Sequence, residues 1–294
     1  MYDAHAGGPI VVFRSEEILE AGDGPAGFNH RGKIVSSAPS PVASLPTFKA
    51  WNTLVAEAID CLGSRGFPDA LGASLRLLSP FQMMNGFIYS SDGRAFDLYN
   101  EKIVAERAVI VDRYVAGAFV LDPFYDAIRA DNSERMIVMR ELAPDDFSRT
   151  EYFRLHYATT AIVDEIGFVL QLNDGYTAVL SLSRTGSAAP FSEEDLQCLR
   201  SAAPLVCTLG SRHWRDTPAL LLEVRNATPL SRIEHPRLTR RELEIVTLIL
   251  KGHSNLSLAA VLGLSPNTVK VHRRQIYSKL NISSQGELFR LFLA

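Results

Sequence analysis

The last 57 residues constrain the fold most, because helix-start signals recur there with no strand pattern between them. Thr239 and Glu242 have the spacing of a capping box, in which a hydroxyl and a carboxylate satisfy the first backbone N–H groups of a helix. A second helix is predicted to open at Ser254, and a third at Ser265 with Pro266 in its first position. Together with a fourth start signal near the C-terminus, this pattern predicts a compact four-helix bundle of the helix-turn-helix type.

The third predicted helix has two different faces. At about 100° per residue, its inward stripe consists of Val269, His272, Ile276 and Leu280. The opposite face consists of Asn267, Lys270, Val271, Arg274 and Ser278. A polar, basic face is also what any solvent-exposed helix presents, and His272 is expected to pack inward and not to read bases. The face alone therefore does not establish a DNA-binding role.

The chemistry of this face suits the major groove of DNA. Lysine and arginine can donate to guanine O6 and N7, and a valine can contact the thymine methyl group. The predicted base contacts are Lys270, Val271 and Arg274. Arg273, Tyr277 and Lys279 flank this face, so we expect them to meet phosphates, which give affinity and register but little sequence choice.

Charge is distributed unevenly along the chain. From Ser231 to the end there are ten Lys/Arg and four Asp/Glu, a balance of +6, and the preceding 230 residues balance −9. A basic module joined to an acidic one indicates that only the C-terminal part meets a polyanion.

The N-terminal part follows a different pattern. Residues 1–46 are rich in Gly, Pro, Ser and Ala and are expected to form a loose arm. Helical spacing begins at Thr47. Aromatic-rich stretches flank an Asp-Gly turn at 92–93, and alternating apolar stretches flank another at 174–175, which predicts two β-hairpins. A short helix with Asp122 as its N-cap and a longer one opened by Ser192, with a kink or break at Pro204, complete the pattern.

These elements predict an α+β domain over residues 47–215, an antiparallel sheet with flanking helices. Residues 216–237 contain three prolines and are interpreted as a linker to the all-α domain of residues 238–294. No cofactor or metal site is expected, because the three cysteines form no CxxC pair. The absence of a signal peptide or long apolar run favours a cytoplasmic protein with no membrane association.

The C-terminal sequence closely resembles the DNA-binding domain of LuxR-type (LuxR/FixJ) bacterial transcription regulators. The matching positions include Leu238-Thr239, Glu242, Glu244, Gly252, Ser254-Asn255, Ala259, Leu262, Ser265, Thr268-Val269-Lys270, His272, Ile276 and Lys279-Leu280. This resemblance implies a dimer, formed mainly through the last helix, that binds a partly palindromic promoter site on double-stranded DNA, with RNA polymerase as a partner. It also places Ser254, Asn255, Asn267 and Thr268 near the DNA backbone. The usual Lys-Glu-Ile after Ser-Asn is replaced here by Leu256-Ser257-Leu258, which removes a charge contact of the second helix.

The upstream domain resembles the PAS/GAF-like sensory domains of the same family. Tyr114, Asp122 and Pro123 resemble a segment of acyl-homoserine-lactone receptors, but the characteristic tryptophans are absent, so the resemblance implies the fold and not the lactone. A phosphorylated receiver is excluded, because the strands come as hairpins and not as a parallel βα repeat. The candidate ligand-pocket residues are Phe87, Tyr89, Tyr114, Asp122, Tyr125, Arg154, Tyr157 and Phe168.

The sequence therefore predicts a dimeric, sequence-specific transcription regulator controlled by an unknown small-molecule inducer. The alternative is a regulator of the same type that a protein partner controls without any ligand. An enzyme is not expected, because the chain contains no GxSxG, HExxH or phosphate-loop motif.

Overall fold

The computed structural model describes residues 45–101, 111–130, 134–218 and 235–293. Most of the predicted arm (1–46) and of the predicted linker (216–237) lies outside these residues. Among the described residues, no helix is long and apolar enough to span a membrane, and no group of His, Cys, Asp and Glu is arranged to bind a metal ion.

A five-stranded antiparallel sheet forms the centre of the N-terminal region, with strand order β2-β1-β5-β4-β3. Its strands are β1 (Met83–Tyr89), β2 (Ala95–Asn100), β3 (Met136–Val138), β4 (Ile162–Gln171) and β5 (Thr177–Thr185). Both predicted hairpins are confirmed, as β1–β2 and β4–β5. The three-residue edge strand β3 was not predicted.

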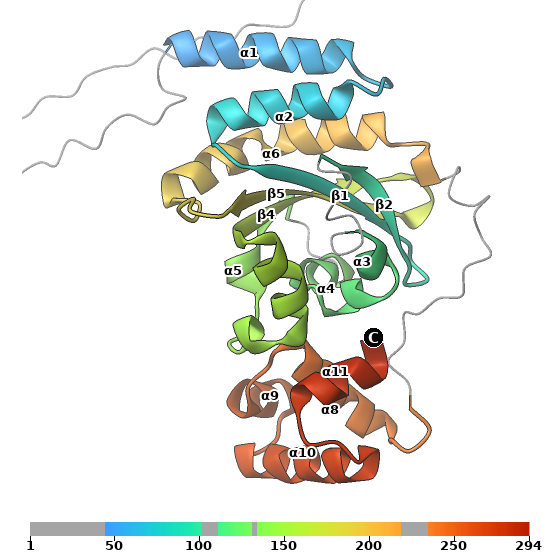
Figure 1. Ribbon diagram of the computed structural model, residues 1–294. Coiled ribbons are helices and arrows are strands. Elements are labelled where there is room, and N and C mark those ends of the chain that lie inside the picture. The colour runs from blue at the N-terminus through green and yellow to red at the C-terminus, as the bar shows by residue number, and fades with distance from the viewer. Residues whose placement is uncertain (1–44, 102–110, 131–133, 219–234, 294) are drawn as a thin grey trace, which may run out of the picture. The chain divides into compact units, whose positions relative to one another are not determined.

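Helices cover both faces of this sheet (Figure 1). One face carries α2 (Phe67–Leu78) and α6 (Glu193–His213), with α1 (Leu45–Asp60) packed on α2. The other face carries the short elements α3 (Arg113–Val115), η3 (Ala118–Leu121), α4 (Pro123–Arg129), α5 (Met139–Leu142), η4 (Phe147–Arg149) and η5 (Phe153–Ala158). The predicted α+β class is thus confirmed, and α6 runs through Pro204 without a break.

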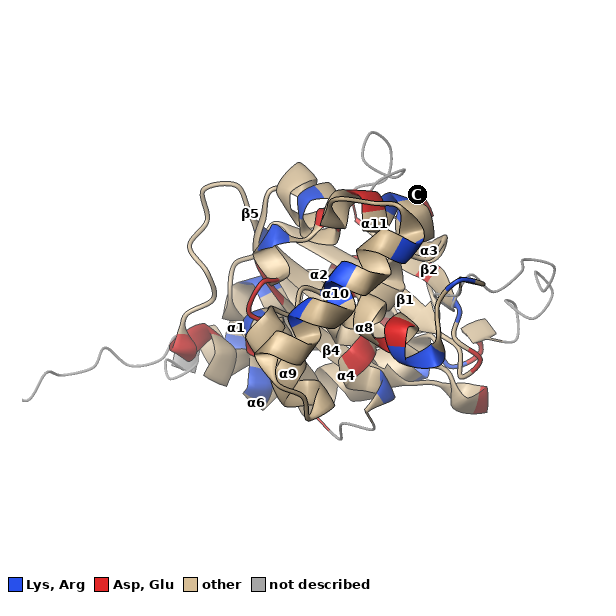
Figure 2. Cartoon of the chain, turned by 90° about the horizontal axis from the view of Figure 1, so that it is seen from below, with Lys and Arg blue, Asp and Glu red and all other residues tan. Residues whose placement is uncertain are grey.

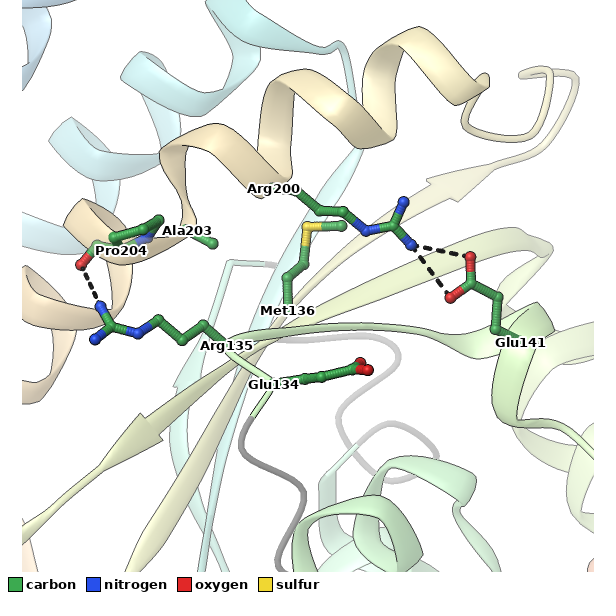
Figure 3. A pocket seen from close by; sticks show the side chains of 7 residues that line it. All are labelled: Glu134, Arg135, Met136, Glu141, Arg200, Ala203 and Pro204. Atoms are coloured by element: carbon green, nitrogen blue, oxygen red, sulfur yellow. Dashed lines mark hydrogen bonds and ion pairs between the residues drawn. The ribbon is translucent and has the colours of Figure 1, made fainter.

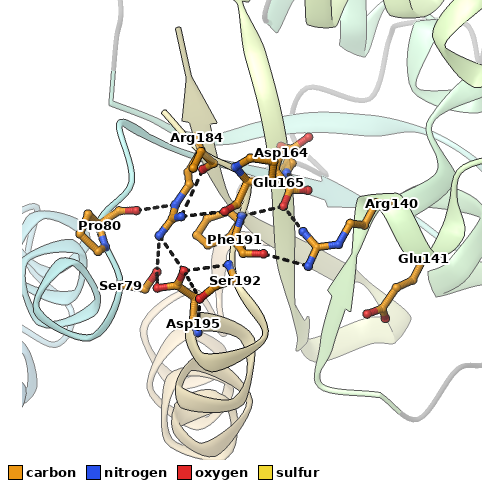
Figure 4. Close-up of polar contacts among 12 residues, drawn as sticks. Ser79, Pro80, Arg140, Glu141, Asp164, Glu165, Arg184, Phe191, Ser192 and Asp195 are labelled. Carbon is orange, nitrogen blue, oxygen red and sulfur yellow. Dashed lines mark hydrogen bonds and ion pairs between the residues drawn. The ribbon is translucent and has the colours of Figure 1, made fainter. Parts of the chain in front are cut away.

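Arg184 on β5 joins the sheet to the start of α6 (Figure 4). Its guanidinium donates to the carbonyl of Pro80 at 2.9 Å and to Ser79 Oγ at 3.1 Å. It also lies 3.1 Å from Asp195, whose carboxylate forms the capping box of α6 with Ser192. Because each member of this network has a partner within the network, we interpret it as structural.

The C-terminal region consists of the four predicted helices, α8 (Arg240–Lys251), α9 (Asn255–Leu262), α10 (Pro266–Leu280) and α11 (Gln285–Leu293). The capping box of Thr239 and Glu242 is present, and the side chains of Ser254 and Ser265 cap α9 and α10 as predicted. Gly252 ends α8 with φ 96°, a left-handed conformation that favours glycine. Local capping chemistry therefore determines where these helices begin and where α8 ends.

Candidate functional site

The outward face of α10 is exposed as the helical spacing predicted. Asn267, Lys270, Val271, Arg274 and Ser278 are all exposed, and Val271 leaves half of its surface, 50%, in solvent. Neither Lys270 nor Arg274 forms a hydrogen bond or ion pair with another described residue. Figure 2 looks onto α10 and shows its basic positions in blue. Two free cations beside an apolar side chain are thus available to a partner.

The inward face of α10 fixes the helix against its neighbours. Val269 and Ile276 are 0% exposed and Leu280 is buried, whereas His272 is half-buried. Lys279 Nζ lies 2.6 Å from Glu242 Oε1 on α8, and this contact lowers the pKa of the Glu242 carboxyl. Lys279, which we predicted to meet phosphate, therefore has an internal partner.

Two other predicted phosphate contacts also have internal partners. Arg273 Nη1 donates to Asn255 Oδ1 at 3.1 Å, which links α10 to the first residue of α9. The Arg273 guanidinium lies 5.9 Å from the centre of the Tyr277 ring, and the Tyr277 hydroxyl is buried. The Arg273–Asn255 hydrogen bond joins α9 and α10, the two helices of the helix-turn-helix.

The start of α9 meets an acidic segment from the N-terminal region. The backbone N–H of Ser254 donates to Asp145 Oδ1 at 3.1 Å. Hydrogen bonding by the Ser254 side chain, followed by this backbone hydrogen bond, lowers the pKa of the Asp145 carboxyl. The backbone N–H of Asp146 donates to the carbonyl of Gly252 at 2.9 Å. A carboxylate thus sits at a helix N-terminus, where backbone N–H groups and the helix dipole favour an anion.

A chain of hydrogen-bonded side chains lies beneath the other face of the sheet. Tyr89 and Tyr114 share a hydrogen bond between their hydroxyls at 2.5 Å, and the Tyr114 hydroxyl donates to Asp122 Oδ2 at 2.7 Å. Asp122 also caps α4, because its Oδ1 accepts from the N–H of Phe124 at 2.8 Å. Burial raises the pKa of Asp122 to about 6.

A second buried carboxylate, Glu165 on β4, faces the same region. The Tyr157 hydroxyl donates to Glu165 Oε2 at 2.6 Å and Ser183 Oγ donates to Oε1 at 3.3 Å. Burial, followed by the charge of Asp122, raises the pKa of Glu165 to about 7. The hydroxyl of Tyr152 is buried without a hydrogen-bond partner, and burial together with the Asp122 charge raises its pKa. We call Tyr89, Tyr114, Asp122, Tyr152, Tyr157 and Glu165 the acid–tyrosine cluster.

The structure brings together six of the eight predicted pocket residues. Phe87, Tyr89, Tyr114, Asp122, Tyr125 and Tyr157 lie on one side of the sheet. Phe168 packs on the opposite side, because side chains alternate along β4. Arg154 is exposed and pairs with Glu151.

Sequence reasoning missed Glu165 and Tyr152 as members of the cluster. A carboxylate inside an otherwise apolar strand was the signal, because burying it requires hydrogen-bond partners.

Two surface hollows lie near the sheet. One of about 250 Å³ reaches the edge of the cluster, because Tyr89 is part of its lining. The other, of about 500 Å³, lies between Met136 at the edge of the sheet and α6 (Figure 3). In this second hollow, Arg200 Nη2 lies 3.0 Å from Glu141 Oε1, and Arg135 Nη1 donates to the carbonyl of Pro204 at 3.4 Å. Of these two hollows, the first has a member of the acid–tyrosine cluster in its lining.

Comparisons with known proteins agree with this geometry. Residues 236–292 match the model of "Bacterial regulatory proteins, luxR family". The HTH-type transcriptional regulator of the exeN 3′ region of Aeromonas salmonicida is 31% identical over 183 residues, covering 58% of this chain and 93% of that protein. The nitrate/nitrite response regulator protein NarP of Escherichia coli is 45% identical over 56 residues, 19% of this chain and 26% of that protein.

One solved structure resembles the N-terminal region. The VqsR LBD domain from Pseudomonas aeruginosa aligns with a TM-score of 0.50 and 22% identity, covering 56% of this chain and 96% of that chain. At this level of identity the likeness supports the fold of the region and nothing more specific.

Proposed function

This chain belongs to the LuxR family of bacterial regulatory proteins, and we propose that it acts as a dimeric, sequence-specific regulator controlled by a small molecule. The family consists of DNA-binding transcription regulators, which are not enzymes. The observation that carries the proposal is the outward face of α10, where Lys270 and Arg274 are exposed and free of described partners.

The outward face of α10, which we call the reading face, is proposed to enter the major groove of DNA. Lys270 and Arg274 would donate to guanine edges and Val271 would contact a thymine methyl. Asn267 and Thr268, at the start of α10, would lie near the phosphates, as would the N-terminus of α9. Each bidentate base contact is worth about 1–3 kcal/mol of discrimination against the wrong base pair.

The acid–tyrosine cluster is proposed as the site that senses the small molecule. It places two buried carboxylates and a buried hydroxyl without a partner among aromatic rings. No described lysine or arginine forms an ion pair with Asp122 or Glu165. A ligand that supplies N–H or O–H donors to these oxygens would satisfy groups whose burial is costly.

A physical connection runs from this cluster to the C-terminal helices through α4. Asp122 caps the start of α4, and Asp126, one turn later, forms an ion pair with Lys251 at the end of α8. A ligand that changes the hydrogen bonds of Asp122 would therefore shift the helix that carries Asp126. The difference in the ligand's affinity for the two positions of α4 would determine how far the equilibrium between those positions shifts.

Dimer formation and contact with RNA polymerase complete the proposal. Leu291 on α11 is 47% exposed, which suits an interface between copies through the last helix. Leu256 and Val261 on α9 are 71% and 56% exposed and give RNA polymerase an apolar contact. Both surfaces lie on helices of the DNA-binding region.

The proposal is tested by thermal unfolding of the full chain with acyl-homoserine lactones and common metabolites as probes. A ligand at 100 times its Kd adds about 2.7 kcal/mol to the free energy of unfolding. The Asp122→Asn and Glu165→Gln variants should lose that response. An unchanged response in both variants would place the ligand elsewhere, and no response to any probe would favour control by a protein partner.

A further inference from the structure

Helix α1 presents an apolar face that no described residue covers. Phe48 and Ile59 on α1 are 46% and 45% exposed, and Leu77 on the neighbouring α2 is 37% exposed. At about 100° per residue, Phe48 and Ile59 lie on one side of the helix with Val55 and Ala56, and exposed Asn52 is the one polar side chain among them. Exposed apolar side chains grouped on one helix indicate a binding surface more often than isolated ones do.

The fold explains why this face is free. Figure 1 shows α1 lying on α2, on the side away from the sheet. Ala58 is the one buried side chain among the described side chains of α1, at 0% exposure. Half-buried Trp51 packs against the hydrophobic cluster to which the buried side chains of α2 belong, and the side with Phe48 and Ile59 is left in solvent.

Two opposite charges border this face. Lys49 and Asp60 are both exposed, and neither forms an ion pair or a side-chain hydrogen bond with a described residue. They project from the same flank of α1, about 20° apart around the helix and eleven positions apart in the sequence. At 1.5 Å per residue they are about 16 Å apart along the axis, too far to pair within one helix.

We infer that α1 pairs antiparallel with α1 of a second copy of this chain. With a two-fold axis near Leu54 and Val55, Lys49 of each copy lies opposite Asp60 of the other. The same pair then forms twice, as an isologous interface requires. Ala56 lies near the axis, where a small side chain allows two helices to approach closely.

The charge pattern favours a second copy over other occupants of the face. A helix with a cation at one end and an anion at the other is complementary to itself only when reversed. Residues 1–44 lead directly into α1 and are the competing occupant, which the test below separates from a second copy. The interface goes beyond the contact proposed for α11, because it joins the N-terminal regions.

Cysteine cross-linking of the full chain tests the pairing. Ala56→Cys places a thiol near the axis, whereas Ala50→Cys places one on the opposite, exposed side of the same helix and is the matched control. Mild oxidation should convert Ala56→Cys into a covalent dimer at least tenfold faster than Ala50→Cys or the unaltered chain. Equal rates for the two variants would overturn the inference.

A charge exchange within the Ala56→Cys chain tests the orientation. Lys49→Asp should slow cross-linking about tenfold by placing like charges together, and Lys49→Asp combined with Asp60→Lys should restore it. Failure of the double exchange to restore the rate would contradict antiparallel pairing. Cross-linking that appears only after removal of residues 1–44 would show that the arm occupies the face and would also contradict it. Neither outcome affects the DNA-binding proposal, because the cross-link reports on α1 alone.

Discussion

Lys279 on α10 and Glu242 on α8 form an ion pair in which the carboxylate is almost fully covered, with 8% of the Glu242 side chain exposed. Glu242 also accepts a hydrogen bond from the backbone N–H of Thr239 at 2.9 Å, so one carboxylate holds both a helix start and a neighbouring helix. Lys279 therefore stabilises the packing of α10 on α8, whereas Lys270 has no described partner and is available to DNA.

Lys279→Ala is expected to lower the free energy of unfolding by about 1–2 kcal/mol, because it leaves a covered carboxylate without its cation. Lys270→Ala on the same helix is the matched control and should change it by less than about 0.5 kcal/mol. Urea unfolding of the full chain measures both. Equal losses in the two variants would show that the ion pair does not stabilise the domain.

Glu165 is expected to make stability fall as pH rises. Its pKa is raised from 4.5 to about 7 by burial, so the folded state keeps a proton that the unfolded state releases. Its stabilising contribution is complete below about pH 4.5 and is lost as pH rises through about 7. As the pH rises from 5 to 8, the free energy of unfolding of Glu165→Gln should therefore increase by on the order of 2–3 kcal/mol relative to that of the unaltered chain.

Thermal unfolding at a series of pH values measures this difference. Glu57→Gln, at an exposed position of α1, is the control and should follow the unaltered chain at every pH. Parallel curves for Glu165→Gln and the unaltered chain would show that Glu165 is ionised in the folded state throughout.

Gly252→Ala is expected to lower the free energy of unfolding far more than Gly263→Ala, although both glycines end helices in the left-handed conformation. A Cβ at 252 would lie 2.7 Å from the Cα of Phe147, whereas a Cβ at 263 meets nothing within 4 Å. Gly263→Ala, the control, should lower the free energy of unfolding by about 1–2 kcal/mol through the backbone conformation alone. Chemical unfolding of the two variants should show the larger loss at 252, and equal losses would mean that the Phe147 segment does not pack on this turn.

Asp145→Ala is expected to raise DNA affinity by about two- to fivefold. Asp145 accepts from the N–H of Ser254 at the start of α9, the position at which a phosphate would compete for the same donor. Asp146→Ala is the control, because the Asp146 contact with Gly252 is made by its backbone. Fluorescence anisotropy at fixed salt measures both affinities, and equal changes would exclude competition at Ser254.

The helices of the DNA-binding region were predictable because their signals are local. Thr239, Ser254 and Ser265 each cap the backbone within three residues, so the sequence itself determines where each helix begins. The two hairpins were predictable for the same reason, since each turn lies between two adjacent strands.

The parts that were missed depend on contacts between distant segments. β3 has three residues and is a strand only because it pairs with β4, which follows it by more than twenty residues. Glu165 joins Asp122 only because the pairing of β4 with β5 determines which face of the sheet it meets. The internal partner of Lys279 lies 37 residues away on α8, so helical spacing alone could not distinguish it from a phosphate contact.

Selection of binding sites from a random duplex DNA library tests the central claim most directly. The unaltered chain and the Arg237→Ala/Arg240→Ala control, which loses two positive charges outside α10, should enrich the same partly palindromic motif. Lys270→Ala/Arg274→Ala should enrich no motif and should bind the selected site at least tenfold more weakly at the same salt concentration. Enrichment of the same motif by Lys270→Ala/Arg274→Ala, with affinity within twofold of the unaltered chain, would contradict the assignment of α10 as the reading helix.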